Sequence, residues 1–418
     1  TIDEAIYSIN PHSHLDHCGL LPKLVREGFR GRIHCTAATA DIARIVLLDA
    51  AHIQEEDAEF KQRRHQREGR KGPFEAKALY TTEDAQKVMP LFKMHDYEAP
   101  VDVGHGVVAT FHEAGHILGS STITVDVPHG GGTRRMLFSG DLGRWGIPIL
   151  NDPTMIEQAD YVVTESTYGD RFHHAQELVP DELAEVINRT YKAGGNIVIP
   201  SFAVERTQEL LFHLSNLLEA DRIPHLRVFV DSPMAIKVTE VFKRHPELFD
   251  EEARALLKEG RHPCDFPGLT MCRSVAESKS INHIRGTAII IAGSGMCTGG
   301  RIKHHLVANI GRPESTIMFV GYQAVGTLGR IILEGADDVR IHGEMHKVRA
   351  HIARINAFSA HADRNEIERW LSGLKTAPRH VFVTHGEAKV AEAFGGFVKE
   401  HFGWSVSVPD YQTCNDLD

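Results

Sequence analysis

Cysteines are few in this 418-residue sequence, and long apolar runs are missing. The six cysteines are scattered and form no CxxC pair, which argues against both a disulfide framework and a thiolate zinc site. No stretch approaches the roughly 18 consecutive apolar residues of a membrane-spanning helix, and the first residues lack the layout of a signal peptide. We therefore predict a soluble protein of a reducing cytoplasm that has no membrane partner.

An excess of positive charge is lacking as well. The chain has 46 Lys and Arg against 56 Asp and Glu, a formal net charge of -10. This balance excludes the globally basic character of many nucleic-acid-binding domains but leaves a local basic patch open. At 418 residues with 42% hydrophobic content, the chain is longer than one compact core usually supports. The prediction is two domains, or one domain interrupted by another.

Histidine, in contrast, is abundant, with 27 residues. Histidine is the commonest metal ligand and titrates near neutral pH. Four candidate ligands, His12, His14, Asp16 and His17, stand close together between a predicted strand and a helical pattern over residues 20–26. Nitrogen and carboxylate ligands without thiolates are typical of a catalytic zinc site with an open coordination position. The alternative is a polar loop that carries histidines without a metal.

Further candidate ligands follow short apolar or β-branched runs that break into a turn, a pattern that predicts α/β architecture. Such runs cover residues 5–9, 136–138, 161–163 and His380–Val383. His116, Asp141 and His385 stand in the turns of the downstream segments. Each alone fits a hydrogen-bonded loop residue, but with the first cluster they supply enough ligands for two metal ions. Two adjacent metals lower the pKa of a shared water and stabilise both oxygens of a displacement, so the predicted chemistry is metal-assisted hydrolysis.

The middle of the chain repeats the strand-and-turn pattern with no metal-ligand cluster. The runs at 196–199, 227–230 and 288–291 lead into loops of Ser, Pro and Gly, which predicts a parallel, Rossmann-like sheet with its ligands at the carboxyl ends of the strands. We therefore predict that residues 170–357 form a domain inserted into a metal-binding domain, which consists of residues 1–169 and 358–418.

The motif His12-Ser13-His14-Leu15-Asp16-His17, with His116, Asp141 and His385, resembles the HxHxDH motif and later ligand positions of the metallo-β-lactamase superfamily. The resemblance covers nearly the whole chain and extends to the β-CASP branch of nucleic-acid hydrolases. It implies an αββα metallo-β-lactamase fold with an inserted β-CASP domain, and two zinc ions per chain. By this resemblance His12, His14 and His116 hold one zinc, Asp16, His17 and His385 hold the other, and Asp141 bridges them.

The β-CASP resemblance also implies catalytic roles for Asp16, Glu165 and His361. Glu165 stands in Thr164-Glu165-Ser166-Thr167 and His361 in Phe358-Ser359-Ala360-His361. The family uses this histidine to protonate the leaving oxygen, with the acidic residue supporting it, and a side chain that titrates near neutral pH suits that task. The alternative for His361 is an N-cap or loop residue before a helix predicted over Arg364–Leu371.

Several stretches of the inserted segment also resemble β-CASP landmarks, and they contain the candidate substrate contacts Arg206, Ser232, Ser294, Gly295 and Arg301. Glycines after a strand let backbone N–H groups approach a phosphate, although they serve equally for a tight turn. A basic run elsewhere fits a solvated helix face more often than an RNA contact. It contains Lys61, Arg63, Arg64, Arg67, Arg70 and Lys71.

The chain departs from the family pattern at its start. Family members normally begin with further strands and a glycine-flanked aspartate, and Pro11 stands where a threonine is common. The departure predicts a partial sequence or a lost sheet edge, and a missing supporting carboxylate would loosen the metal ligands.

The resemblance as a whole implies a zinc-dependent ribonuclease that hydrolyses single-stranded RNA, with a metal-bridging hydroxide as the nucleophile, and a homodimer. Two alternatives stay open: a hydrolase of a small ester, lactone or phosphodiester, since one fold hosts many substrates, and an inactive RNA-binding subunit, against which the intact ligands argue. Endonuclease versus 5′-exonuclease action, and RNA versus DNA, are not decided by the sequence.

Overall fold

The computed structural model describes residues 7–69, 72, 74–173, 176–355 and 358–417. The chain divides into two compact units. Unit 1 comprises Thr1–Trp145, Asp152–Arg171 and His361–Asp418, and unit 2 comprises Gly146–Asn151 and Phe172–Ala360. Gly146–Asn151 belongs to unit 2 because the Asp250 N–H donates to the carbonyl of Ile149. Unit 2 is thus inserted into the sequence of unit 1, as the motif order suggested.

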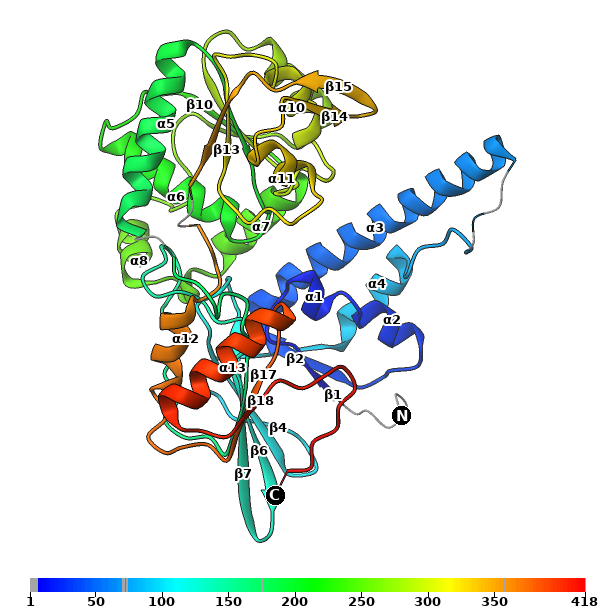
Figure 1. The fold of residues 1–418 in the computed structure, drawn as a ribbon, viewed down its shortest axis with the longest axis vertical. Helices are drawn as coiled ribbons and strands as arrows, with labels where there is room; N and C mark the ends of the chain where they lie inside the picture. Colours follow the sequence, from blue (N-terminus) through cyan, green and yellow to red (C-terminus); the bar gives the residue numbers. More distant parts are fainter. Residues whose placement is uncertain (1–6, 70–71, 73, 174–175, 356–357, 418) are drawn as a thin grey trace. The chain divides into compact units, whose positions relative to one another are not determined.

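Unit 1 contains two sheets (Figure 1). Its strands are β1 (Tyr7–Ile9), β2 (Arg32–Thr36), β3 (Phe92–His95), β4 (Val101–Gly104), β5 (Val107–Glu113), β6 (Ser121–His129), β7 (Gly132–Phe138), β8 (Tyr161–Thr164), β17 (His380–Val383) and β18 (Val406–Ser407). Three parallel strands form one sheet in the order β1-β2-β3. The other seven form a mixed sheet in the order β18-β17-β8-β7-β6-β5-β4, antiparallel from β4 to β7 and parallel from β7 to β18.

The helices of unit 1 cover these sheets. They are α1 (Leu15–Cys18), α2 (Leu21–Arg26), α3 (Ala37–Glu68), α4 (Thr82–Val88), the 3-10 turn η2 (Met89–Leu91), α12 (Arg364–Leu371) and α13 (Ala388–Phe402). Trp370 and Phe394 from the last two helices are fully buried in one cluster with Val162 and Val381 of the mixed sheet. Ile9 of β1 packs with Phe111 and Ile123 of β5 and β6 in a second cluster.

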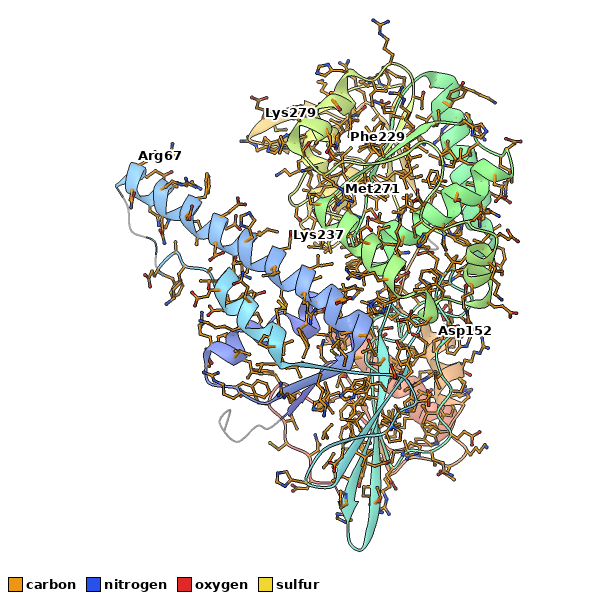
Figure 2. All side chains as sticks on the ribbon, turned by 180° about the vertical axis from the view of Figure 1, so that it is seen from behind. Arg67, Asp152, Phe229, Lys237, Met271 and Lys279 are labelled. Carbon is orange, nitrogen blue, oxygen red and sulfur yellow. The ribbon has the colours of Figure 1, made fainter. Side chains whose placement is uncertain are left out.

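Helix α3 spans 32 residues and is much longer than any strand of unit 1. The Thr36 side chain caps its start by accepting the Thr39 N–H, and Gly69, with a φ of 61°, ends it in the left-handed conformation that glycine adopts without strain. Its buried residues lie mostly in the first half, whereas the second half is exposed and carries the basic run up to Arg67 (Figure 2).

Unit 2 is a parallel α/β unit with a separate hairpin. Its strands are β9 (Ile197–Pro200), β10 (Arg227–Asp231), β11 (Leu269–Met271), β12 (Ala288–Ala292), β13 (Thr316–Phe319), β14 (Asp338–Ile341), β15 (Glu344–Lys347) and β16 (His351–Arg354). Six form one parallel sheet in the order β11-β10-β12-β9-β13-β16, and β14 and β15 pair as the antiparallel hairpin. The expected Rossmann-like parallel sheet is therefore present.

The helices of unit 2 alternate with its strands. They are η3 (Gln176–Leu178), α5 (Val179–Ala193), α6 (Arg206–Glu219), α7 (Pro233–Arg244), η4 (Pro246–Leu248), α8 (Glu251–Lys258), α9 (Val275–Ser280), η5 (Ile281–His283), α10 (Ile302–Asn309) and α11 (Leu328–Leu333). Leu306 of α10 and Ile332 of α11 are fully buried against Ile290 and Phe319 of the sheet. Strands β9, β10 and β12 are apolar on both faces, as burial of a parallel sheet under helices requires.

The structure contains the predicted strands and helices, and their ends differ slightly from the predicted ones. The first predicted strand is seen from Tyr7 onward as β1, and its residues 5 and 6 lie outside the described part of the chain. The helix predicted over 20–26 is α2, and the one predicted after His361 is α12. Among the described helices, none is long and apolar enough to cross a membrane.

Candidate metal centre

The candidate ligands of unit 1 meet at one edge of its two sheets because each follows the end of an element. The loop after β1 carries His12 and His14, and helix α1 carries Asp16 and His17. The loop between β5 and β6 carries His116. Asp141, Glu165 and His385 follow β7, β8 and β17, which are neighbours in the mixed sheet. Parallel strands place their carboxyl ends side by side, so residues distant in sequence converge.

Three groups of donor atoms, each within 4.8 Å of one another, share Asp141, and the smallest joins it to Glu165 and His361. The two larger groups are the candidate metal-binding sets. The first set is His12, His14, His116 and Asp141. Nε2 of His12 lies 3.2 Å, and Nε2 of His116 3.6 Å, from Asp141 Oδ2. Nε2 of His116 also lies 3.2 Å from Nδ1 of His14. All four side chains thus point at one small volume.

The second set is Asp16, His17, Asp141 and His385. Nε2 of His17 and Nδ1 of His385 lie 3.2 and 3.4 Å from Asp141 Oδ1. Nε2 of His385 lies 3.3 Å from both Asp16 Oδ2 and Nε2 of His17. Asp141 therefore turns one carboxylate oxygen to each set.

The donor chemistry fits a pair of divalent cations. Nε2 of His12 and both carboxylate oxygens of Asp141 are buried and make no hydrogen bond to any described residue. Burial lowers the pKa of His12, of His116 and of His14, the last to about 3, which keeps these imidazoles neutral as metal ligands require. Buried, unpartnered lone pairs that face each other are costly without a cation between them. Nitrogen and carboxylate donors without sulfur suit zinc.

The second set is more exposed and its charges are paired. A hydrogen bond from His385 holds the pKa of Asp16 below its usual range, and the same contact raises the pKa of His385 to about 9. Burial alone would raise the pKa of Asp141, but the neighbouring His12 and His17 hold it well below its usual range. Both carboxylates are therefore ionised at neutral pH and ready to hold cations.

His361 and Glu165 contact each other beside the candidate metal ligands. Nδ1 of His361 lies 3.1 Å from Glu165 Oε2, and Nε2 lies 4.0 Å from Asp141 Oδ2. Glu165 is buried and its Oε1 accepts the Leu142 N–H at 2.6 Å. Although burial lowers it, the pKa of His361 is raised by the Glu165 carboxylate. The alternative role as an N-cap falls to Asp363, whose side chain accepts the Glu366 N–H of α12.

Several residues outside the predicted site hold the candidate ligands in place. The Asn10 side-chain amide donates to the carbonyl of His12, and the Thr167 hydroxyl lies 3.2 Å from Nδ1 of His385. His385 itself has a φ of 48°, an uncommon value for a residue with a side chain and one that recurs at functional sites. Gly143 is required because an added Cβ would lie 1.8 Å from the carbonyl oxygen of Gly115, next to His116.

The five candidate substrate contacts belong to unit 2, and all five have structural partners there. The carbonyl of Gly295 accepts a hydrogen bond from the side-chain amide of Gln323 at 2.9 Å. Arg206 is buried and paired with Glu209, and Arg301 donates to Asp231 Oδ1 at 2.6 Å. The Ser232 side chain caps α7, and the Ser294 hydroxyl accepts the N–H groups of Thr298 and Gly299. These partners stabilise the loops at the strand ends, and a contact of the five residues with RNA stays a prediction.

The basic run on α3 shows the features of a solvated helix face. Arg63 pairs with Glu59, and Arg64 donates to Glu68 at 2.8 Å, both at a spacing of four residues. Exposed pairs at this spacing are typical of a solvated helix face and stabilise it only slightly. Arg70 and Lys71 lie outside the described residues.

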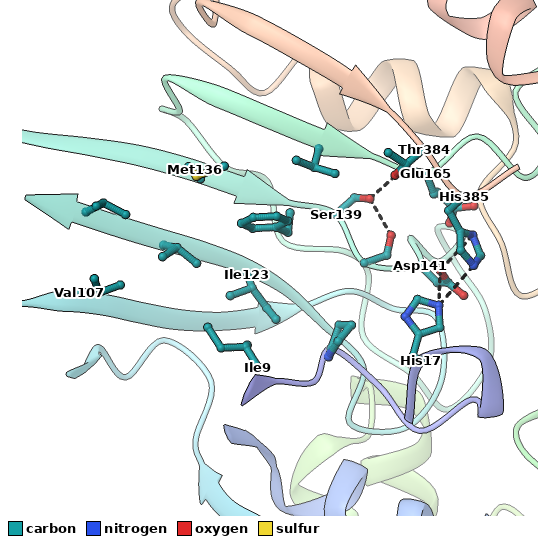
Figure 3. Close-up of a pocket in the computed structure, with 16 residues that line it drawn as sticks. Ile9, His17, Val107, Ile123, Met136, Ser139, Asp141, Glu165, Thr384 and His385 are labelled. Carbon is teal, nitrogen blue, oxygen red and sulfur yellow. Dashed lines mark hydrogen bonds and ion pairs between the residues drawn. The ribbon is translucent and has the colours of Figure 1, made fainter. Parts of the chain in front are cut away.

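An apolar cavity of about 620 Å³ adjoins the second donor set (Figure 3). Its far part is lined by side chains of the two sheets, among them Ile9, Val107 and Ile123. At its other end stand His17, Asp141 and His385. The cavity lies wholly within unit 1.

Two protein-family models match the chain. The Beta-Casp domain matches residues 207–332, and the Zn-dependent metallo-hydrolase RNA specificity domain matches residues 345–409. Ribonuclease TTHA0252 of Thermus thermophilus is 37% identical over 92% of this chain and 82% of its own length. Transcription termination factor FttA is 31% identical both in Methanosarcina mazei, over 90% of this chain and 58% of the relative, and in Thermococcus kodakarensis, over 100% and 62%. The chain thus spans less than two thirds of these two termination factors.

Proposed function

The chain belongs to the β-CASP family of metallo-hydrolases with the metallo-β-lactamase fold, and from this premise we propose that it is a zinc-dependent ribonuclease. One observation carries the proposal: two sets of nitrogen and carboxylate donors share Asp141, and a His361–Glu165 pair lies directly beside them. The match to an RNA specificity domain and the similarity to a protein named ribonuclease favour RNA as the substrate.

In this proposal His12, His14 and His116 would hold one zinc, Asp16, His17 and His385 would hold the other, and Asp141 would be a ligand of both. When bound, such a metal pair lowers the pKa of water and stabilises the negative charge that develops on a phosphoryl group. The protein keeps the three imidazoles of the first set neutral by burial and keeps Asp16 and Asp141 ionised.

His361 supplies the proton in the same proposal. Its Nδ1 faces Glu165, so a doubly protonated ring presents the Nε2–H on the side of the metal set. A 3′ alkoxide is a poor leaving group, and a proton donated from Nε2 lets it depart as an alcohol. Glu165 favours the protonated ring and fixes its orientation, since the carboxylate also accepts the N–H groups of Leu142 and Thr167.

The direct test is cleavage of a fluorescent single-stranded RNA by zinc-loaded protein, beside His361→Ala and Asp141→Ala variants whose metal content is determined. The proposal requires cleavage by the unaltered chain and its loss in both variants, with metal retained in His361→Ala. Absence of RNA cleavage by fully loaded protein would refute it. Gel analysis of end-labelled RNA distinguishes endonuclease from 5′-exonuclease action, and sedimentation tests the homodimer that the family resemblance implies.

A second candidate function is hydrolysis of a small apolar ester. The cavity of about 620 Å³ that opens beside His17, Asp141 and His385 favours it, because apolar walls with a few convergent polar groups are typical of small-molecule sites. A panel of p-nitrophenyl esters with acyl chains of different length tests this candidate. Ester turnover without RNA cleavage would replace the first proposal with the second.

A further inference from the structure

A cavity of about 500 Å³ lies in unit 2 between α9, α10 and the β14–β15 hairpin. Its volume falls in the range of roughly 300–1,000 Å³ that is common for small-ligand sites. The candidate ligands of the metal centre all belong to unit 1, so the cavity is a separate feature. Its walls carry His304, His342 and His346 together with Lys279, which is labelled in Figure 2.

Three histidine rings of this cavity, those of His304, His342 and His346, are available to bind a ligand. The rings of His304 and His342 are stacked, with centroids 4.6 Å apart and planes at 27°. Neither these two rings nor His346 makes a hydrogen bond to another described side chain or backbone group. His342 holds its place in the hairpin turn with a φ of 51°, followed by Gly343 at 90°. The fold therefore keeps a stacked imidazole pair at the cavity wall without using it for internal bonding.

The cavity also carries a fixed cationic edge. Arg301 donates to Asp231 Oδ1 and to the backbone carbonyls of Cys272 and Arg273, which hold the guanidinium in place. The other oxygen of the Asp231 carboxylate lies 2.6 Å from Nε2 of His305. Lys279 has no carboxylate partner among the described residues. Glu344 is the acidic side chain among the described lining residues. An ammonium group and an anchored guanidinium among the lining residues suit a phosphate.

We propose that this cavity binds one nucleotide unit, with its phosphate at Lys279 and Arg301 and its base stacked on the His304–His342 pair. Aromatic and imidazole rings hold unpaired bases by stacking, and cationic groups hold the backbone phosphate. A residue of an RNA strand and a free mononucleotide offer the same chemistry. An RNA strand as the occupant rests on the proposed ribonuclease function, whereas a free mononucleotide does not.

The test measures binding of 5′-AMP to the full chain by calorimetry, and of a fluorescent oligoadenylate by anisotropy in the His361→Ala background. The variants are Lys279→Ala, His304→Ala and His342→Asn, the last chosen because asparagine tolerates a positive φ and lacks the imidazole. Lys192→Ala and His225→Asn, exposed positions of unit 2 outside the cavity, are the matched controls. We expect the dissociation constant for AMP to rise about tenfold or more in the three variants, the size of a lost stacking or phosphate contact, and to stay unchanged in the controls.

The binding results distinguish an RNA strand from a free nucleotide as the occupant of the cavity. Weaker binding of both AMP and oligoadenylate supports an RNA strand as the occupant, and weaker binding of AMP alone supports a free nucleotide. AMP binding that is absent, or unaltered in all three variants, overturns the proposal. So does a zinc ion that saturates the three histidines in a metal titration and excludes AMP. RNA cleavage by the unaltered chain is followed in parallel: its absence would refute the ribonuclease and leave the AMP result standing.

Discussion

The His361 ring lies between the buried Glu165 carboxylate and Asp141, the residue common to both donor sets: its Nδ1 lies 3.1 Å from Glu165 Oε2 and its Nε2 lies 4.0 Å from Asp141 Oδ2. One ring nitrogen is therefore committed to an internal partner while the other faces the reaction site. In the proposed function this arrangement makes the ring a proton donor of fixed orientation, and several predictions test it.

Replacing His361 with alanine should lower kcat for RNA cleavage on the order of 10²–10⁴-fold, because the leaving oxygen loses its proton donor. The metal content should stay at two zinc ions, since the donor atoms of both sets remain. Metal analysis and single-turnover kinetics check both statements, with His401→Ala, which pairs with Glu368 and belongs to neither donor set, as the control. A variant that cleaves RNA at the normal rate would exclude His361 as the donor.

Asp141→Asn should bind fewer than two zinc ions and lose RNA cleavage. Asparagine keeps the shape of the side chain but offers only one weakly donating oxygen, whereas the carboxylate turns one oxygen to each donor set. Chelation of the unaltered protein should likewise abolish cleavage, and added zinc should restore it. Zinc analysis after dialysis is the measurement, and Asp126→Asn, paired with Arg135 away from the cluster, is the control. Full retention of two zinc ions by Asp141→Asn would contradict the shared-ligand assignment.

Asp363→Ala should lower the free energy of unfolding by about 1 kcal/mol, because α12 loses the side chain that accepts the Glu366 N–H. Asp250→Ala, which removes the equivalent cap of α8 in unit 2, should cost a similar amount. Only Asp363→Ala should also reduce RNA cleavage, since its helix starts immediately after His361. Denaturant titrations and kcat measured on both variants check this, and equal kcat values would refute the link between the cap and the catalytic ring.

The buried His213 should make unit 2 less stable in mild acid. Burial lowers its pKa from 6.5 to about 4, so the folded state keeps the ring neutral while the unfolded chain protonates it. This contribution to stability is fully present above pH 6.5 and is lost as the pH falls towards 4, up to about 3 kcal/mol in all. His213→Gln should flatten the dependence of unfolding free energy on pH across that window, and His225→Gln, an exposed control, should leave it unchanged. An unchanged slope in His213→Gln would contradict the assignment.

The sequence was sufficient to predict the kind of fold. Alternating apolar runs and turns indicated a parallel sheet between residues 170 and 357, and the structure has six parallel strands there. Local patterns work for such elements because a buried parallel strand must be apolar on both faces. The seven-stranded sheet was harder to predict from the sequence, since β4 to β7 are antiparallel and half-exposed. Their order also depends on pairings between distant segments.

The candidate ligands were likewise readable from residue type and spacing, because only a few side chains bind zinc and a cluster as dense as His12 to His17 is uncommon away from metal sites. The contacts that hold the candidate ligands in place could not be predicted from the sequence. Thr167 reaches His385 across 218 positions, and Gly143 owes its identity to a close approach of the Gly115 backbone. The carboxylate partners of Arg206 and Arg301 were not predictable either, and the role of these arginines as substrate contacts stays a prediction.

The sequence by itself determined which side chains are available for metal and proton chemistry and at which strand ends they stand, since both follow from residue type and local hydrophobic pattern. Only the tertiary structure decided that Asp141 turns an oxygen to each donor set, that Glu165 lies against His361 from 196 positions away, and that burial keeps the His12, His14 and His116 rings neutral. Distances between side chains depend on how strands pair and how deeply loops are buried, and both arise from contacts between segments that no local pattern records.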